Sequence, residues 1–147
     1  MMGKAKKRMR NKSDRQKMID KIDKVCGDIT RLIDRVCQKC GAPGPGLHSS
    51  HVKSKGKYSN LRFDLLNLIA LCYKCHLHWW HKEPTESGKW FKKKYPERLK
   101  YLEKHKSLTE GIKTDDLPDI LKERRQKLKE LQNEIFLTPE LDYGVEE

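Results

Sequence analysis

Two pairs of closely spaced cysteines constrain this chain more than any other feature of its sequence. Cys37 and Cys40 form one CxxC pair, Cys72 and Cys75 form a second, and 31 residues separate the two. This spacing is typical of a tetrahedral zinc site, because each CxxC turn presents two thiolates to one ion. We therefore expect the four thiolates to bind one structural zinc ion that closes the segment between them.

The composition suits a fold that needs a metal. Only 35% of the 147 residues are hydrophobic and 37% are charged, so the core is small and a structural ion can replace missing apolar burial. The sequence has neither an apolar leader pattern nor a run of about 20 apolar residues. This favours a soluble cytoplasmic protein. Cys26 has no CxxC partner and lies beside an apolar helical stripe, so we interpret it as a small buried side chain.

Charge is unevenly distributed along the chain. The formal net charge is +12, with basic excess in residues 1–17 and 82–106 and acidic excess in residues 115–147. Basic surface near the cysteine motifs favours a polyanionic partner, and DNA is the obvious candidate. The alternative is a solvated basic surface that binds nothing in particular.

The chain divides into four predicted segments around one small α+β domain. They are a basic disordered tail (1–12), an N-terminal helix (13–36), a zinc-clipped domain (37–106) and a C-terminal helix with an acidic tail (107–147). Within the domain we expect strands over 47–53 and within 61–71, a polar loop over 53–60, and helices over 72–81 and 86–106. Pro96 is expected to break the last of these helices. The apolar stripes of the first and last helices could pair within one chain or across a homodimer.

Three residues within this domain have the chemistry of a hydrolytic site. Asn67 follows His51 by 16 positions, and His76 follows Asn67 by nine. A neutral imidazole can activate water at physiological pH, since its ordinary pKa is near 6.5. A divalent cation would stabilise the charge that develops on a phosphate. As alternatives, the histidines could be surface or packing residues and Asn67 a turn former.

The stretch from CQKCG through LHSSHVKSKGKYSNLRFDLLNLIALCYKCH resembles the zinc-clipped HNH endonucleases of phages, including the NinG recombination-nuclease type. The resemblance covers about residues 36–106. It implies a ββα-metal core that hydrolyses DNA with Mg²⁺ or Mn²⁺, in phage recombination, processing or packaging. It also implies that His51 is the general base, that Asn67 orients it and that His76 is a metal ligand. The resemblance also implies a cytoplasmic protein, either a phage protein in a host cell or a protein of the bacterial cytoplasm.

The sequence departs from the family pattern directly before the base. Many HNH enzymes have an acidic residue or histidine there as the other metal ligand, whereas this chain has Ser50. His48 is the nearest better donor and Asp64 is the second candidate. His48 and His51 are three residues apart, so on a regular strand their side chains point to opposite faces. Their convergence on one site therefore needs a twist or a bulge.

The remaining candidates surround this motif. Lys53, Lys55, Lys57 and Arg62 lie in or beside the loop that follows the base, and we predict that they contact DNA phosphates. His78 and His81 could bind metal but are more often simply exposed. Trp79 and Trp80 could stack on bases, although core packing of at least one is favoured. The rival function is a non-catalytic zinc-finger DNA-binding protein, which would not need the His51, Asn67 and His76 set.

Overall fold

The computed structural model describes residues 12–137, so most of the basic tail and the acidic end of the chain lie outside the described residues. Its elements are α1 (Asp14–Asp34), β1 (His48–His51), β2 (Leu68–Leu71), the π-helix η3 (Lys74–Trp80), α2 (Pro84–Lys94), α3 (Pro96–His105) and α4 (Leu117–Leu137). Short 3₁₀ turns cover Ser59–Leu61, Leu65–Asn67 and Thr114–Asp116. A small two-stranded sheet among helices confirms the predicted α+β class.

Local signals set the ends of α1. The Ser13 hydroxyl accepts a hydrogen bond from the Gln16 backbone N–H at 3.2 Å, which satisfies one of the free donors of the first turn. At the other end Arg35 has a φ of 63°, and its N–H bonds the Arg31 carbonyl at 2.9 Å. This left-handed residue stops the helix just short of the predicted boundary and turns the chain toward Cys37.

The two strands form a short antiparallel hairpin that carries the histidine motif. Its register pairs His48 with Leu71 and His51 with Leu68, and a hydrogen bond of 2.9 Å from Val52 N to the Asn67 carbonyl extends the ladder. The four pairs follow one another regularly, so β1 contains no bulge, which was one of the two expected ways, a twist or a bulge, of bringing His48 and His51 to one site. His48 and His51 therefore leave opposite faces of the strand.

The connection from α1 to the first cysteine pair covers the outer edge of β2. The Ala70 N–H donates to the Asp34 carboxylate at 2.8 Å, and the Ala70 carbonyl accepts from Gln38 N at 3.0 Å. These bonds satisfy backbone groups that an edge strand otherwise leaves free. They also place Cys37 beside the strand that leads to Cys72.

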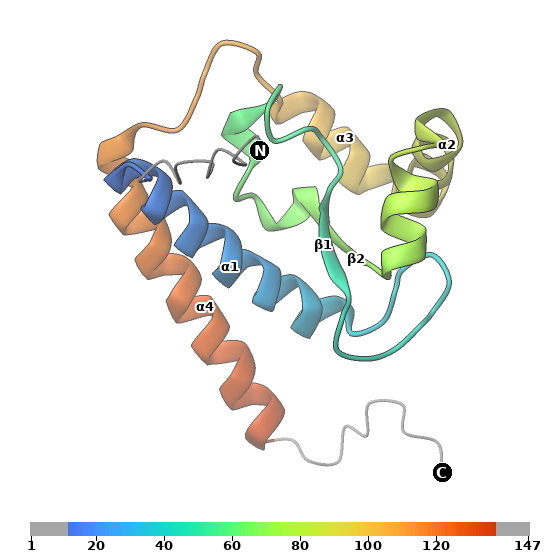
Figure 1. Ribbon diagram of the computed structural model, residues 1–147, viewed down its shortest axis with the longest axis horizontal. Coiled ribbons are helices and arrows are strands. Elements are labelled where there is room, and N and C mark those ends of the chain that lie inside the picture. The colour runs from blue at the N-terminus through green and yellow to red at the C-terminus, as the bar shows by residue number, and fades with distance from the viewer. Residues whose placement is uncertain (1–11, 138–147) are drawn as a thin grey trace, which may run out of the picture.

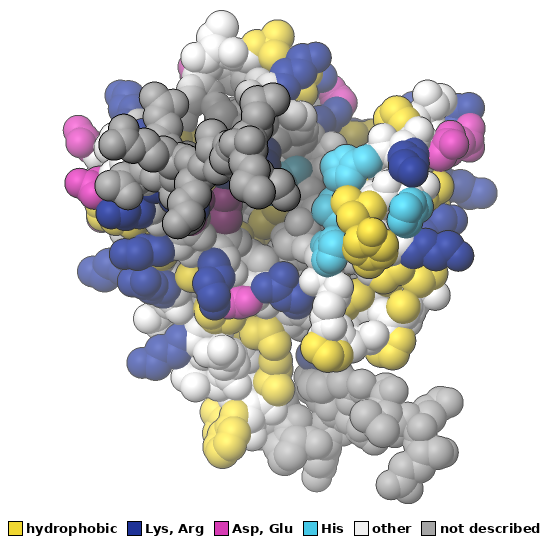
Figure 2. All heavy atoms as spheres, viewed as in Figure 1, with side chains coloured by type: hydrophobic (Ala, Val, Ile, Leu, Met, Phe, Trp, Pro, Cys, Tyr) yellow, Lys and Arg dark blue, Asp and Glu magenta, His cyan; other side chains and the backbone are white. Residues whose placement is uncertain are grey.

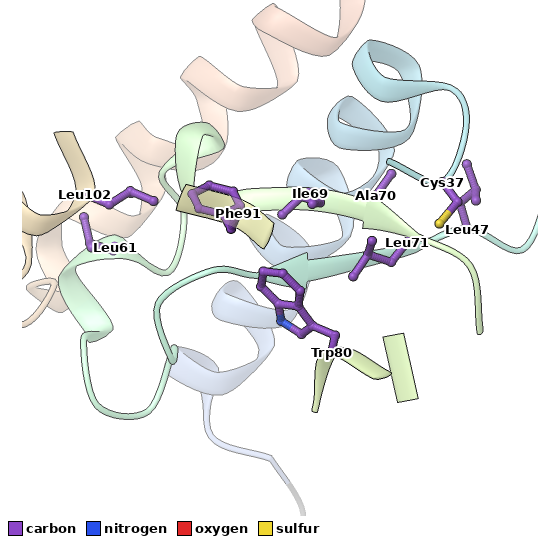
Figure 3. Packing of buried hydrophobic residues seen from close by; sticks show 9 residues of the cluster. All are labelled: Cys37, Leu47, Leu61, Ile69, Ala70, Leu71, Trp80, Phe91 and Leu102. Carbon is purple, nitrogen blue, oxygen red and sulfur yellow. The ribbon is translucent and has the colours of Figure 1, made fainter. Parts of the chain in front are cut away.

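The hairpin lies between two helical layers (Figure 1). α1 and α4 lie on one side, whereas η3, α2 and α3 lie on the other. A separate hydrophobic cluster fills each side of the hairpin. The cluster on the η3 side contains Cys37, Leu47, Leu61, Ile69, Ala70, Leu71, Trp80, Phe91 and Leu102 (Figure 3). The cluster under α1 contains Ile22, Val25, Cys26, Ile29, Phe63, Leu68, Leu117 and Leu121.

α1 and α4 run in the same direction and pack along their apolar stripes (Figure 1). At their N-terminal ends the Arg15 guanidinium donates to the Thr114 hydroxyl at 2.6 Å. This confirms pairing of the two stripes within one chain, whereas a homodimer stays a prediction. The break at Pro96 is also confirmed, because α2 ends at Lys94 and α3 begins at Pro96. None of the helices in residues 12–137 is long and apolar enough to cross a membrane.

Candidate metal centre and histidine site

The four CxxC cysteines come together in one cluster. The Sγ atoms of Cys37, Cys40, Cys72 and Cys75 all lie within 4.8 Å of one another. The Cys40 and Cys72 sulfurs are 3.7 Å apart, which matches the edge of about 3.8 Å of a tetrahedron with Zn–S bonds of about 2.3 Å. This cluster can hold a zinc ion, and it joins the end of α1 to the start of η3.

A backbone amide points at the first sulfur of each CxxC turn. Cys40 N points at the Cys37 sulfur at 3.5 Å, and Cys75 N points at the Cys72 sulfur at 3.4 Å. Burial opposes ionisation of Cys37, but backbone hydrogen bonds outweigh it and lower the pKa of this thiol to about 7. Cys26 behaves differently, because it is only 1% exposed and burial raises its pKa to about 11. The prediction that Cys26 is a buried side chain is confirmed.

His51 lies at the end of β1, and one of its ring nitrogens is hydrogen-bonded to the protein backbone. Its Nε2 lies 3.0 Å from the Arg62 carbonyl oxygen. A carbonyl oxygen only accepts hydrogen bonds, so Nε2 carries the proton and Nδ1 keeps its lone pair. Burial is the main cause that lowers the pKa of His51 below its ordinary value. The ring is therefore neutral at physiological pH and has Nδ1 as its basic atom.

His76 lies between two other imidazoles. Its Nδ1 is 2.9 Å from Nδ1 of His48, and its Nε2 is 2.8 Å from Nε2 of His81. Burial, helped by the neighbouring His81, His48 and His51, lowers the pKa of His76 to about 4, so this ring too is neutral. Figure 2 shows histidine side chains gathered on one face of the molecule beside hydrophobic side chains.

The π-helix explains why His81 is near His76. In an α-helix, residues five apart point about 140° away from each other. Here His81 N–H bonds the His76 carbonyl at 3.2 Å, which is the i→i+5 pattern of a π-turn. The wider turn brings the two rings to one side, with centroids 4.6 Å apart. His78 lies elsewhere and packs edge-on against Tyr73.

The spacing between the paired imidazoles suits a cation. Two nitrogens bound at about 2.1 Å to one ion, on adjacent corners of an octahedron, are about 3.0 Å apart. The His48–His76 pair and the His76–His81 pair both have this separation. The three rings do not converge on one point, because the cysteine cluster is the only group of three or more such ligands in residues 12–137. His76 can thus share an ion with either neighbour.

Asn67 is fully buried directly before β2, and its side chain ties two loops together. Its Oδ1 accepts from Lys53 N at 2.7 Å, while its Nδ2 donates to the Lys53 carbonyl at 3.0 Å and to the Leu61 carbonyl at 3.1 Å. The first loop directly follows His51, and the second precedes Arg62, whose carbonyl holds the His51 ring. Asn67 therefore fixes both segments that determine where His51 lies.

Arg98, on α3, supports the same region and was missed by sequence reasoning. Its guanidinium donates to the carbonyls of Leu65, Leu66 and Leu68, with Nε 2.6 Å from the Leu66 oxygen. These carbonyls bracket Asn67. A lone arginine among the many basic residues of α2 and α3 gives no sequence signal for such a role.

A cavity of about 680 Å³ opens beside the histidines. Its lining includes His51, His76, His81, Lys53, Lys55 and Arg62, together with Asp23 and Cys26 of α1. The four residues predicted to contact DNA fall into two groups. Lys55 and Lys57 are exposed, whereas Lys53 is paired with Glu103 and Arg62 is paired with Asp23. Of these four side chains, only those of Lys55 and Lys57 form no ion pair with an acidic side chain of the described residues.

The two alternative metal ligands, Asp64 and Ser50, have different surroundings. Asp64 accepts from Leu66 N at 2.9 Å and from the Tyr101 hydroxyl at 2.6 Å, outside the cavity. Ser50 is 1% exposed and its hydroxyl has no hydrogen-bond partner within the described part of the chain. Neither side chain forms a hydrogen bond with a histidine within residues 12–137.

The tryptophans also differ in their surroundings. Trp80 is buried, and its indole N–H donates to the His51 carbonyl at 3.3 Å. This confirms core packing of at least one of the pair. Trp79 packs edge-on against Trp90 at 5.4 Å, with the Lys39 ammonium 4.9 Å from the Trp79 ring centre.

These features define a small α+β protein with a cysteine cluster able to hold zinc. Comparison with protein families matches residues 2–134 to the family described as Bacteriophage Lambda NinG protein. Because the match covers most of the chain, the chain belongs to this family of phage proteins, and α1 and most of α4 belong to the shared region. Neither a curated protein nor a solved structure matched the chain.

Proposed function

We propose that this protein is a metal-dependent HNH endonuclease that hydrolyses DNA phosphodiester bonds during phage recombination or DNA processing. The observation that carries the proposal is the state of His51. Its Nε2–H is held by the Arg62 carbonyl, so a neutral ring offers Nδ1 as a base at a cavity that Lys55 also lines. The order β1, β2, η3, with zinc-type cysteines at both ends, supports an HNH core.

Each residue of the motif has one task in this proposal. His51 Nδ1 takes the proton from the attacking water. Asn67 prevents the loops on either side of His51 from shifting, which keeps the base at a fixed angle. His76, together with His48, holds the cation at the adjacent site. Lys55 and Lys57 supply positive charge for the DNA backbone.

The histidine nitrogens that would bind the cation indicate which cation the site prefers. A bound divalent ion neutralises the charge that develops on the phosphate and leaving oxygen. Imidazole nitrogen suits first-row transition ions, whereas Mg²⁺ prefers oxygen ligands. The histidines therefore favour Mn²⁺ over Mg²⁺ among the two expected ions. Co²⁺ and Ni²⁺ should bind more tightly than either.

A plasmid-nicking assay with and without EDTA tests the proposal. We expect cleavage that EDTA abolishes and that added Mn²⁺ or Co²⁺ restores. The zinc content of the same samples separates loss of the catalytic ion from loss of structural zinc. Binding of DNA without cleavage under every metal would instead support the non-catalytic zinc-finger protein.

Two variants separate the base from the metal ligand. His51→Ala should reduce cleavage by about 10²- to 10⁴-fold, and added metal should not correct it. His48→Ala should also lose activity, but higher metal concentration should partly restore it because only metal affinity falls. His78→Ala is the matched control, since His78 lies on η3 away from the cavity. Residual cleavage by His51→Ala above about a tenth of the parental rate would contradict the assignment.

A further inference from the structure

The carboxylate of Asp23, on α1, forms a two-point ion pair with Arg62. Arg62 Nε lies 3.0 Å from Oδ1 and Nη2 lies 2.6 Å from Oδ2. The two side chains are 29% and 21% exposed, so the pair is largely sheltered. Both carboxylate oxygens are occupied by the planar guanidinium, which gives the contact a defined direction.

The same Arg62 provides the carbonyl that holds His51. This carbonyl accepts from His51 Nε2 at 3.0 Å, and it follows the Ser59–Leu61 turn, which Asn67 holds at the Leu61 carbonyl. The loop is thus secured from two sides. Asn67 secures it from the hairpin, while Asp23 secures it from α1, which packs against the hairpin (Figure 1).

We propose that Asp23 is a positioning residue for His51, acting through Arg62. This inference rests on the proposed nuclease function for its kinetic consequence but not for its structural one. By holding the Arg62 side chain, Asp23 keeps the Arg62 carbonyl within reach of Nε2. The carbonyl in turn keeps the proton on Nε2 and leaves Nδ1 basic. α1 therefore takes part in the reaction site although it lies outside the cysteine-bounded segment.

Arg62 then has a structural role instead of the contact with a DNA phosphate that its position in the sequence predicts. Its guanidinium is directed at a carboxylate of the same chain, so its charge is already matched before DNA arrives. Removal of this arginine should therefore affect the rate of the chemical step more than DNA affinity.

The state of the His51 ring can be read directly by long-range ¹H–¹⁵N NMR correlation of the histidine side chains. The parent should give a single Nε2–H tautomer for His51. Asp23→Asn removes the carboxylate charge and one acceptor at nearly constant volume, and it should give a mixture of the two tautomers. Asp28→Asn is the matched control, because Asp28 also lies on α1 and pairs with Arg31 at 2.7 Å. It should leave the His51 signals unchanged.

Kinetics provide the second measurement. Asp23→Asn should lower kcat by about 10- to 100-fold with less than about a twofold change in KM for DNA, since orientation of the base is lost and binding is not. Arg62→Lys keeps the charge but not the two-point contact, and it should show the same pattern. The double variant should be no worse than the poorer single variant.

These measurements distinguish failure of the positioning role of Asp23 from failure of the proposed nuclease function. A single Nε2–H tautomer in folded Asp23→Asn, or equal effects of Asp23→Asn and Asp28→Asn, would overturn the positioning role. A tautomer mixture in Asp23→Asn alone supports that role even if the parent cleaves no DNA, in which case the nuclease proposal fails by itself. Amide spectra of each variant verify that it is folded.

Discussion

Neighbouring residues of β1 have very different environments. His48 lies in contact with His76, whereas Ser50 is enclosed and its hydroxyl has no partner within residues 12–137. A buried hydroxyl without a hydrogen bond costs free energy, commonly about 1–3 kcal/mol. Ser50 lies directly before His51, at the position where many HNH enzymes have an acidic residue or histidine as a metal ligand.

Ser50→Ala should be tolerated, and it should leave the free energy of unfolding unchanged or raise it by about 1 kcal/mol. The reason is that alanine removes an unsatisfied polar atom and leaves only a small volume empty. Urea denaturation measures the stability, and the nicking assay measures the activity. A folded Ser50→Ala protein that cleaves at a small fraction of the parental rate would show that the hydroxyl serves the site.

His51 should give a cleavage rate that depends on pH in a defined direction. Burial lowers the pKa of its ring, and the positive charge of Lys55 lowers it further. The base works when unprotonated, so kcat should rise with pH through a midpoint below the ordinary value of about 6.5. Lys55→Gln should move this midpoint to higher pH at saturating DNA. A midpoint above 6.5 in the parent, or no response to Lys55→Gln, would contradict this assignment of the base.

At the scale of elements, sequence reasoning succeeded where the signals are local. An apolar helical stripe predicted α1, Pro96 predicted the break after α2, and the CxxC pairs predicted the cysteine cluster. The stripe and the proline act within their own segment of the chain, and each CxxC pair is recognised from four consecutive residues. The hairpin was predicted as well, although its strands are shorter than expected and β1 has no bulge.

The parts that were not predicted depend on distant partners. No pattern distinguishes the π-turn that brings His81 to His76 from an α-helix, because the choice is made by packing. Arg98 reaches carbonyls about 30 residues earlier in the chain, and Asp23 reaches Arg62 39 residues later. From the sequence alone, a basic residue that has such a partner within the chain looks the same as one that contacts DNA.

The cysteine cluster joins α1 to η3, so its loss should affect the whole domain. Cys72→Ser should lose zinc, unfold at a much lower temperature and have no activity, because binding of structural zinc is coupled to folding. Cys26→Ala is the matched control, since this cysteine is buried but remote from the cluster. It should keep one zinc ion per chain and lose only about 1 kcal/mol of stability. Metal analysis and thermal melting report both results, and a well-folded Cys72→Ser protein with a full complement of zinc would rule out the four-cysteine site.

For the molecule as a whole, charge should determine DNA affinity. The net charge is +12, and several of the lysines and arginines closest to the cavity are paired within the chain. We therefore predict that basic residues elsewhere on the chain contribute to DNA binding in addition to Lys55 and Lys57. Residues 1–11 lie outside the described residues but are rich in lysine and arginine, whereas residues 138–147 are acidic.

DNA affinity should fall steeply with salt, because each phosphate that the protein neutralises releases a counterion. Deleting residues 2–11 should flatten the slope of log affinity against log salt, by about 0.9 for each lost phosphate contact on duplex DNA. Deleting residues 138–147 is the matched control of equal length, and it should leave the slope unchanged or steepen it. Fluorescence anisotropy at several salt concentrations measures all three proteins. An equal slope in the parent and in the protein without residues 2–11 would show that this basic segment does not contact DNA, and would assign the contacts to the lysines of the folded domain.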